Sequence, residues 1–141
     1  MRKTLAALGL VLALTGGAAT AVAQEAAPDL RGTWTGTSES IVRGAPMHHG
    51  PSQGNAPGLD NVAFTMTISG QDGRRFWGTF SSKLNQEPII GVVANDGKSF
   101  VMRDTDGLTT GTIVDANTMD MVYSHVGKSA VVSALRVTRK K

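Results

Sequence analysis

The side chains in this sequence that are best suited to chemistry are its three histidines. Two of them adjoin each other in the run Met47-His48-His49. Neutral imidazoles and thioethers are ligands for copper or zinc, but adjacent residues of an extended chain point to opposite sides. The spacing also matches no zinc-ligand pattern. We therefore expect His48 and His49 to lie in a solvated loop without a metal, as part of an interaction surface.

The third histidine, His125, alternates with Met119, Met121 and Tyr123 along one face of an expected strand. If that face is internal, Tyr123 and His125 form a small polar handle in an apolar ligand pocket, an arrangement that specific binding sites often use. The alternative is a histidine at a strand end that is satisfied by backbone or water. Alternation alone leaves both faces possible, because it does not say which one is inside.

The sequence contains few residues in patterns that are typical of catalytic sites. The sequence has no cysteine, and neither Gly-x-Ser-x-Gly nor His-Glu-x-x-His occurs in it. Four aspartates, Asp72, Asp96, Asp106 and Asp115, fall at expected turns, where aspartate is favoured for its hydrogen bonds to the backbone. We therefore predict a protein that is not an enzyme and that needs no cofactor and no metal.

The elements that must position these residues are β-strands. Apolar and polar residues alternate with a period of two in successive segments, and Asp-Gly pairs mark tight hairpin turns between several of them. The expected strands are residues 32–42, 62–69, 74–82, 88–94, 99–103, 108–114, 119–126 and 130–139. Eight consecutive hairpin-connected strands predict an all-β, antiparallel up-and-down meander that closes into a small barrel. An open sandwich is the competing architecture.

Alternation also divides the aromatic residues between the two faces of the expected barrel wall. The positions expected to line the lumen as ligand-binding residues are Phe64, Met66, Phe76, Phe80, Phe100 and Met102. Arg75 and Trp77 then face outward, where tryptophan and arginine are typical of interaction surfaces. The alternative for Trp77 is an indole that lies flat on the barrel wall.

Two segments fall outside this strand pattern. Residues 1–23 combine a basic start, a short apolar run and the small-residue sequence Ala21-Val22-Ala23, which predicts a cleaved signal peptide and a mature domain of residues 24–141. The protein is then periplasmic or extracellular, with no transmembrane segment in the mature chain. Residues 44–61 are rich in glycine and proline and predict a long flexible loop.

The charge balance of the mature domain argues against a nucleic-acid-binding surface. Without Arg2 and Lys3, twelve of the 14 basic residues remain against 11 acidic ones. Such a small excess of positive charge gives no basic patch. We therefore expect no nucleic-acid partner.

Three features resemble the calycins, the group of barrels that contains lipocalins and avidins. Gly32-Thr33-Trp34 resembles the Gly-x-Trp of their first strand, and Arg136 or Arg139 is placed to pack across that tryptophan. The segment from Met66 to Phe80 is similar to the second hairpin of avidins. The chain departs from avidins in having only two tryptophans and from many lipocalins in having no cysteine. The resemblance implies a barrel, and Trp34 is either its plug or part of a pocket.

These observations together predict a non-enzymatic binding protein for a small apolar or amphipathic ligand. The alternative is a protein–protein interaction module, or a protease-inhibitor-like envelope protein, whose barrel is filled by its own side chains. The oligomeric state stays open.

Overall fold

A computed structural model describes residues 27–54 and 56–141 of the chain, and this part is built of β-strands. The predicted signal peptide, residues 1–23, lies outside the described residues. The strands are β1 (Gly32–Arg43), β2 (Gly58–Asp60), β3 (Ala63–Asp72), β4 (Arg75–Ser81), β5 (Gln86–Val93), β6 (Ser99–Arg103), β7 (Leu108–Asp115), β8 (Thr118–His125) and β9 (Ala130–Arg139). The described part of the chain contains no helix that is long and apolar enough to cross a membrane.

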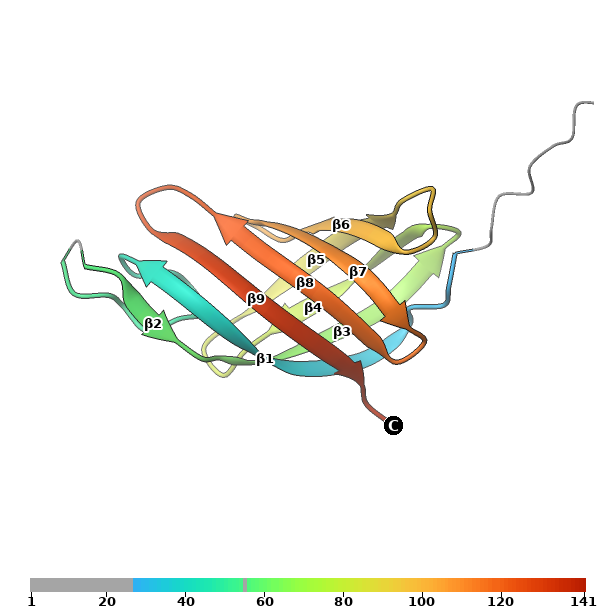
Figure 1. Ribbon diagram of the computed structural model, residues 1–141, viewed down its shortest axis with the longest axis horizontal. Coiled ribbons are helices and arrows are strands. Elements are labelled where there is room, and N and C mark those ends of the chain that lie inside the picture. The colour runs from blue at the N-terminus through green and yellow to red at the C-terminus, as the bar shows by residue number, and fades with distance from the viewer. Residues whose placement is uncertain (1–26, 55) are drawn as a thin grey trace, which may run out of the picture.

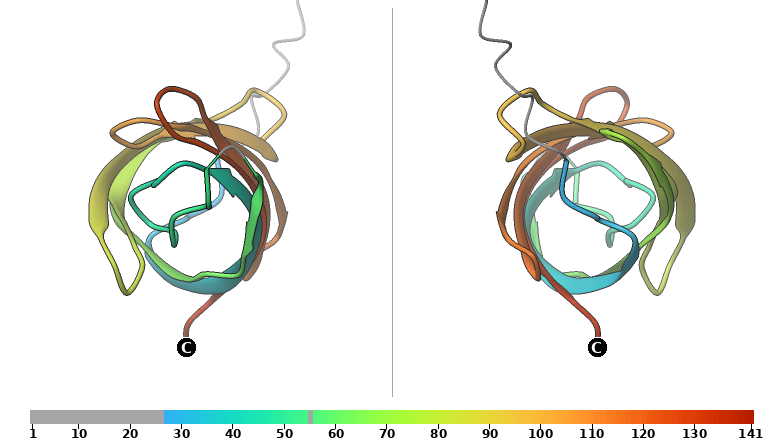
Figure 2. Two further views of the ribbon diagram at one scale, coloured as in Figure 1. Left: turned by 90° about the vertical axis from the view of Figure 1, so that its left-hand side faces the viewer. Right: turned by 90° about the vertical axis from the view of Figure 1, so that its right-hand side faces the viewer.

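The strands form one antiparallel sheet that closes on itself. Strand β1 pairs with β3, each strand from β3 to β8 pairs with the next in sequence order, and β9 returns to pair with β1. The closing register places Trp34 opposite Arg139 and Ile41 opposite Val132. Figure 1 shows the barrel from the side, and the end-on views of Figure 2 show the strands surrounding a ring-shaped section. The predicted eight-stranded up-and-down barrel is therefore confirmed, with β2 as a short additional strand.

Strand β2 arises because β1 is longer than its neighbour can cover. Residues Gly32–Thr37 of β1 pair with β3, whereas Ser40–Val42 pair with β2 on the same edge. A free strand edge exposes unpaired backbone donors and acceptors, so a short pairing segment there satisfies them. The sequence analysis placed these residues in the long loop, since three residues are too few to show alternation.

Alternation determines which side chains fill the barrel. Trp34, Met66, Phe76 and Phe100 are all buried in one continuous core, whereas Trp77 faces outward. Small residues make room for the large ones: a Cβ on Gly91 would lie 2.2 Å from the ring of Phe76. These side chains therefore fill part of the lumen, as side chains commonly do in small barrels.

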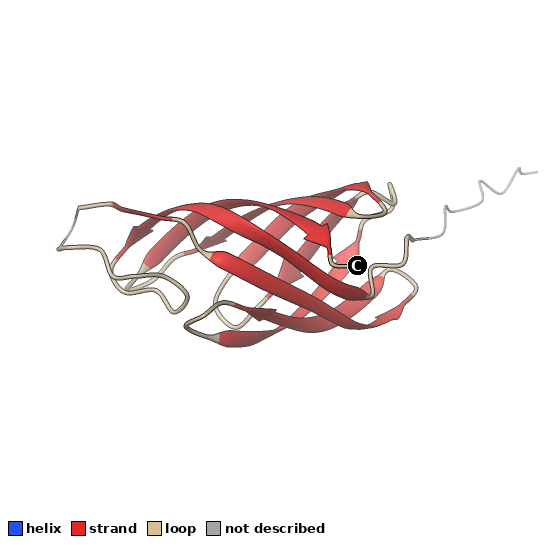
Figure 3. Ribbon diagram, turned by 90° about the horizontal axis from the view of Figure 1, so that it is seen from below, coloured by secondary structure: helices blue, strands red, loops and turns tan. Residues whose placement is uncertain are grey.

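Another part of the lumen receives the segment that follows β1. Figure 2 shows this segment, in teal, inside the outline of the barrel mouth. His48 is only 8% exposed and His49 only 6% exposed. The expectation that these two histidines lie in a solvated loop is therefore wrong, because the loop turns inward at Pro46 and places both imidazoles in the barrel. Figure 3 shows that the remaining connections are mostly short turns at the two ends of the strands.

Candidate functional site

A cavity lies in the lumen between the inward-turned loop and the strands β1, β3, β4 and β6–β9. Its volume is about 30 Å³. Part of its wall is apolar and includes Phe64, Phe80, Met102, Met121 and Leu135. The polar residues of the wall are Ser38, His48, His49, Asp104, Asp106, Thr109, Tyr123, His125 and Ser133. One enclosed space thus combines an apolar wall with converging polar groups.

His48 fills the space beside this cavity. Its Nε2 lies 2.9 Å from Oε2 of Glu87, and its Nδ1 lies 2.9 Å from Oγ of Ser82. The imidazole also makes edge-on contacts with the rings of Phe64 and Phe80, at centroid distances of 5.4 and 6.5 Å. The side chain is therefore held by two polar partners and two aromatic rings.

His49 is held by a different partner. Its Nδ1 lies 3.2 Å from Oδ2 of Asp60, the last residue of β2. Burial lowers the pKa of His49, because the charged imidazolium loses its water, and nearby His48 and His125 act in the same direction, whereas Asp60 opposes the shift. The neutral imidazole is thus the form that the barrel favours.

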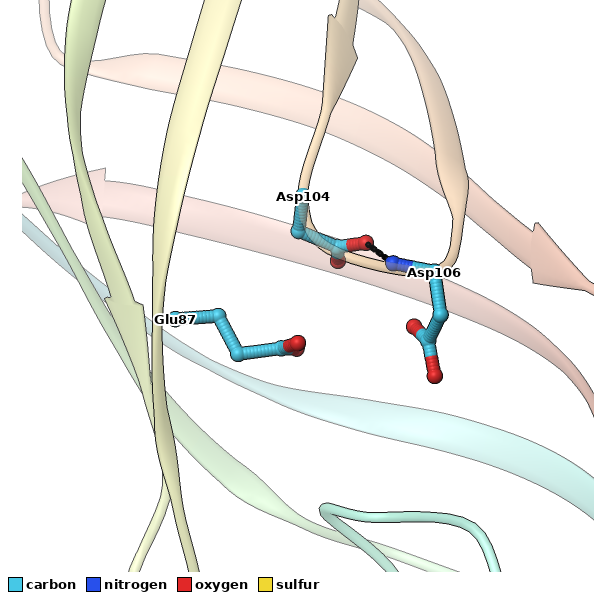
Figure 4. A group of neighbouring side chains, drawn as sticks. All are labelled: Glu87, Asp104 and Asp106. Carbon is cyan, nitrogen blue, oxygen red and sulfur yellow. Dashed lines mark hydrogen bonds between the residues drawn. The ribbon is translucent and has the colours of Figure 1, made fainter.

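Three carboxylates meet beside the cavity, which Asp104 and Asp106 line; Figure 4 shows them together with Glu87. Glu87 on β5 points toward Asp104 and Asp106, which come from the turn between β6 and β7, and one oxygen of each lies within 4.8 Å of the other two. Glu87 is 3% exposed, and its Oε1 has no hydrogen-bond partner among the described residues. A buried carboxylate oxygen without a partner is costly, so it marks a place where something can bind.

Tyr123 and His125 extend the polar group on β8. The hydroxyl of Tyr123 donates to Oδ1 of Asp106 at 3.0 Å and lies 3.0 Å from Nδ1 of His125. With that proton directed to Asp106, Nδ1–H of His125 is the donor to the phenol oxygen. Burial raises the pKa of Tyr123, with further contributions from the negative charges of Asp104 and Asp106. The phenol is therefore a persistent hydrogen-bond donor.

The structure brings together part of the predicted ligand-binding set. Phe64, Phe80, Met102, Tyr123 and His125 line the cavity. The question that alternation left open is thereby answered, since the face of β8 that carries Met119, Met121, Tyr123 and His125 is the inner one. The other predicted ligand-binding residues, Trp34, Met66, Phe76 and Phe100, are buried in the packed core instead.

The remaining predicted residues lie on the outer wall. Trp77 is 46% exposed and packs over Gly70, where a Cβ would lie 2.3 Å from the indole. Arg75 is exposed and pairs with Asp72 across the β3–β4 turn. The indole of Trp77 thus lies on the barrel wall, as one expectation has it, and it also exposes part of its surface to solvent, as the other requires.

Glu87 and Asp104 are not among the site residues predicted from the sequence. A signal was present, since Glu87 shares the inward face of β5 with Ile89 and Val93 and is the acidic residue in that alternation. The expected strand began at residue 88, which left Glu87 outside it. Asp106 was assigned a turn role, and it lies in a turn, but its carboxylate also faces the cavity.

Comparisons with protein families, with curated proteins and with solved structures found no match for this chain. The calycin resemblance therefore remains at the level of architecture: a closed antiparallel barrel with Trp34 on its first strand and Arg139 on its last.

Proposed function

We propose that this protein is a non-enzymatic binding barrel, exported to the periplasm or the cell exterior, that takes a small apolar or amphipathic ligand into its lumen. The observation that carries the proposal is the cavity whose wall is apolar on one side and polar on the other. Ligand sites in proteins typically combine a mainly hydrophobic lining with a few placed polar groups. The resemblance to calycins, whose barrels bind small ligands, points the same way.

The ligand takes the place of His48. A volume of about 30 Å³ has room for only about two water molecules. The rings of Phe64 and Phe80, which now contact the imidazole, would then contact the ligand. Side-chain hydrogen bonds to Ser82 and Glu87 hold His48 in place, so its withdrawal leaves the sheet intact.

The polar end of an amphipathic ligand lies toward β8. When the bond between Tyr123 and His125 opens, Nδ1–H of His125 is a donor and the phenol oxygen of Tyr123 is an acceptor for the ligand, whose apolar end lies against Phe80 and Met102. This arrangement favours a ligand with one hydrogen-bonding head and a short apolar body.

A second candidate is the protein–protein interaction module with a filled barrel. It is favoured by the small size of the cavity and by apolar residues on the outside of β4–β6. Trp77, opposite Ile90, and Val92, opposite Val101, are all exposed. The protease-inhibitor-like alternative belongs to this candidate, which requires no space in the lumen.

The experiment that tests the first candidate is a truncation of His48, the side chain whose place the ligand takes. His48→Ala removes the imidazole, and we expect this variant to bind the fluorophore indole, which has one N–H group and a small apolar body, saturably and more tightly than the unchanged protein. Leu59→Ala, at a highly exposed position on β2, controls for binding to surface apolar groups and is expected to leave the affinity unchanged.

Methionine methyl resonances locate the bound fluorophore. Met102 and Met121 line the cavity, whereas Met66 and Met119 lie in the packed core. We expect the fluorophore to shift the Met102 and Met121 methyl signals and to leave the other two in place. A folded His48→Ala protein that shows no saturable binding would overturn the proposal and leave the interaction module as the remaining candidate.

A further inference from the structure

The acidic group beside the cavity is assembled from two separate elements. Glu87 lies near the start of β5, and Asp104 and Asp106 lie in the β6–β7 turn. One oxygen from each carboxylate lies within 4.8 Å of the others. Like charges at this separation repel one another, and a cation between them removes the repulsion.

An independent observation points to a ligand at the same place. Only 3% of the surface of Glu87 is exposed, so the residue is more than nine-tenths buried. Its Oε1 has no hydrogen-bond partner among the described residues. Figure 4 shows this carboxylate directed toward the two aspartates. A buried oxygen that carries charge and lacks a partner has a large desolvation cost, which coordination to a cation offsets.

The protein already holds the three carboxylates in place. Oε2 of Glu87 is bound by His48, Oδ1 of Asp106 accepts from Tyr123, and Oδ1 of Asp104 accepts from the backbone N–H of Gly107 at 2.7 Å. Outer partners of this kind orient the ligands of a metal site. Each carboxylate thus has one oxygen engaged with the protein.

We propose that Glu87, Asp104 and Asp106 form a binding site for a hard divalent cation, with Ca²⁺ as the preferred ion. The three donors are all oxygens, which hard cations select. Ca²⁺–O bonds of about 2.3–2.6 Å allow donor oxygens to lie up to about 5 Å apart, whereas Mg²⁺ spans about 4.2 Å and demands an octahedron. The adjoining cavity has room for about two waters, which would add two further oxygen ligands to the three carboxylate oxygens.

This inference goes beyond the binding of a lumen ligand and does not depend on it. The prediction of no metal rests on the spacing of the histidines and does not consider these three carboxylates. Only the closure of β5 against β6, and of β6 against β7, brings the carboxylates together.

The test is calorimetric titration of the purified protein with Ca²⁺ alone, and with Mg²⁺ for comparison. We expect saturable binding of one Ca²⁺ and weaker binding of Mg²⁺. Glu87→Gln removes one charge with little change of shape, and we expect it to weaken Ca²⁺ binding by at least about tenfold. Glu39→Gln, the same change at an exposed position on β1, is the matched control and should bind as the unchanged protein does.

A second variant and a second readout keep the test independent of folding defects. Asp106→Asn changes a carboxylate whose side chain is 39% exposed, and it should also lose Ca²⁺ affinity while retaining its thermal unfolding transition. In the unchanged protein, Ca²⁺ should raise the melting temperature. Absence of saturable Ca²⁺ binding, or equal affinity in the unchanged protein and both variants, would overturn the inference, whatever the result with indole.

Discussion

The guanidinium group of Arg139 lies over the ring of Trp34, with its Cζ 4.2 Å from the ring centroid. The two residues are paired across the β1–β9 seam that closes the barrel. Arg139 also donates to the carbonyl oxygens of Asp29 and Arg31, and Trp34 Nε1 donates to the carbonyl of Leu30 at 2.9 Å. One arginine thus joins the first strand, the last strand and the lead-in segment at this end of the barrel.

Replacement of Arg139 should loosen this closure. Arg139→Ala removes the cation–π contact and the hydrogen bonds to the lead-in segment, and we expect the free energy of unfolding to fall by about 1 kcal/mol. Urea unfolding followed by tryptophan fluorescence measures the change. Arg43→Ala, at an exposed arginine of β1, should have little effect, and an equal loss in both variants would contradict the role of the stacked pair.

Gly78 is required by the close approach of β3 and β4. A Cβ at this position would lie 1.8 Å from the carbonyl oxygen of Thr67, a backbone atom that cannot move without disturbing the strand pair. We expect Gly78→Ala to destabilise the protein by about 1–3 kcal/mol. Thermal unfolding measured by circular dichroism checks this expectation.

Gly50 supplies the matched control for that change. A Cβ there would meet nothing within 4 Å, and the backbone is not in the left-handed region. Gly50→Ala should therefore leave the melting temperature close to that of the unchanged protein. Equal melting temperatures for the two alanine variants would show that the β3–β4 contact can adjust.

His49 should make the protein sensitive to mild acid. Its pKa in the folded state is lowered, chiefly by burial, so the unfolded chain binds a proton at a higher pH than the folded one. The stability associated with neutral His49 is therefore complete above about pH 6.5, the usual histidine pKa, and is lost as pH falls below it. Urea unfolding at neutral and mildly acidic pH should reveal this loss.

The variant His49→Gln isolates this contribution. Glutamine does not titrate, so the difference in stability between neutral and mildly acidic pH should be smaller in the variant than in the unchanged protein. Asp29, Asp96 and Asp120 have lowered pKa values and contribute only in stronger acid. Identical pH dependence in both proteins would contradict the burial of a neutral His49.

Tyr123 allows a direct titration, because it is the only tyrosine of the chain. Burial and the neighbouring carboxylates raise its pKa above the ordinary value of 10.0. We expect the near-ultraviolet absorbance of the phenolate to stay absent at pH 10 in the folded protein and to appear in denaturant. Since the unfolded chain loses this proton first, stability should decline as pH rises above 10.0.

Asp106 provides the control for that titration, because its carboxylate accepts the Tyr123 hydrogen bond. Asp106→Asn removes a nearby negative charge and should lower the midpoint of phenolate formation. If cation binding occurs at the same carboxylates, Ca²⁺ should lower the midpoint in the unchanged protein as well. A phenolate that forms near pH 10 in the folded state would contradict the enclosed position of Tyr123.

The architecture could be predicted from the sequence because it depends on local patterns. Alternating residues such as Phe64, Met66 and Ile68 on β3, followed by the Asp72–Gly73 turn, specify a strand and a hairpin within a few residues of chain. Repetition of that pattern predicts a meander, and a free first and last strand favour closure. The outward position of Trp77 follows from the same alternation.

The tertiary structure alone decided the site. Whether β8 turned Tyr123 and His125 inward depended on closure of the sheet, since alternation is symmetric between its two faces. The inward course of the loop depended on partners far along the chain, because His48 finds Glu87 and His49 finds Asp60 only after β1, β2 and β5 are assembled. The meeting of Glu87 with Asp104 and Asp106 has the same origin. Contacts between residues on separate strands produce no sequence motif from which they could be predicted.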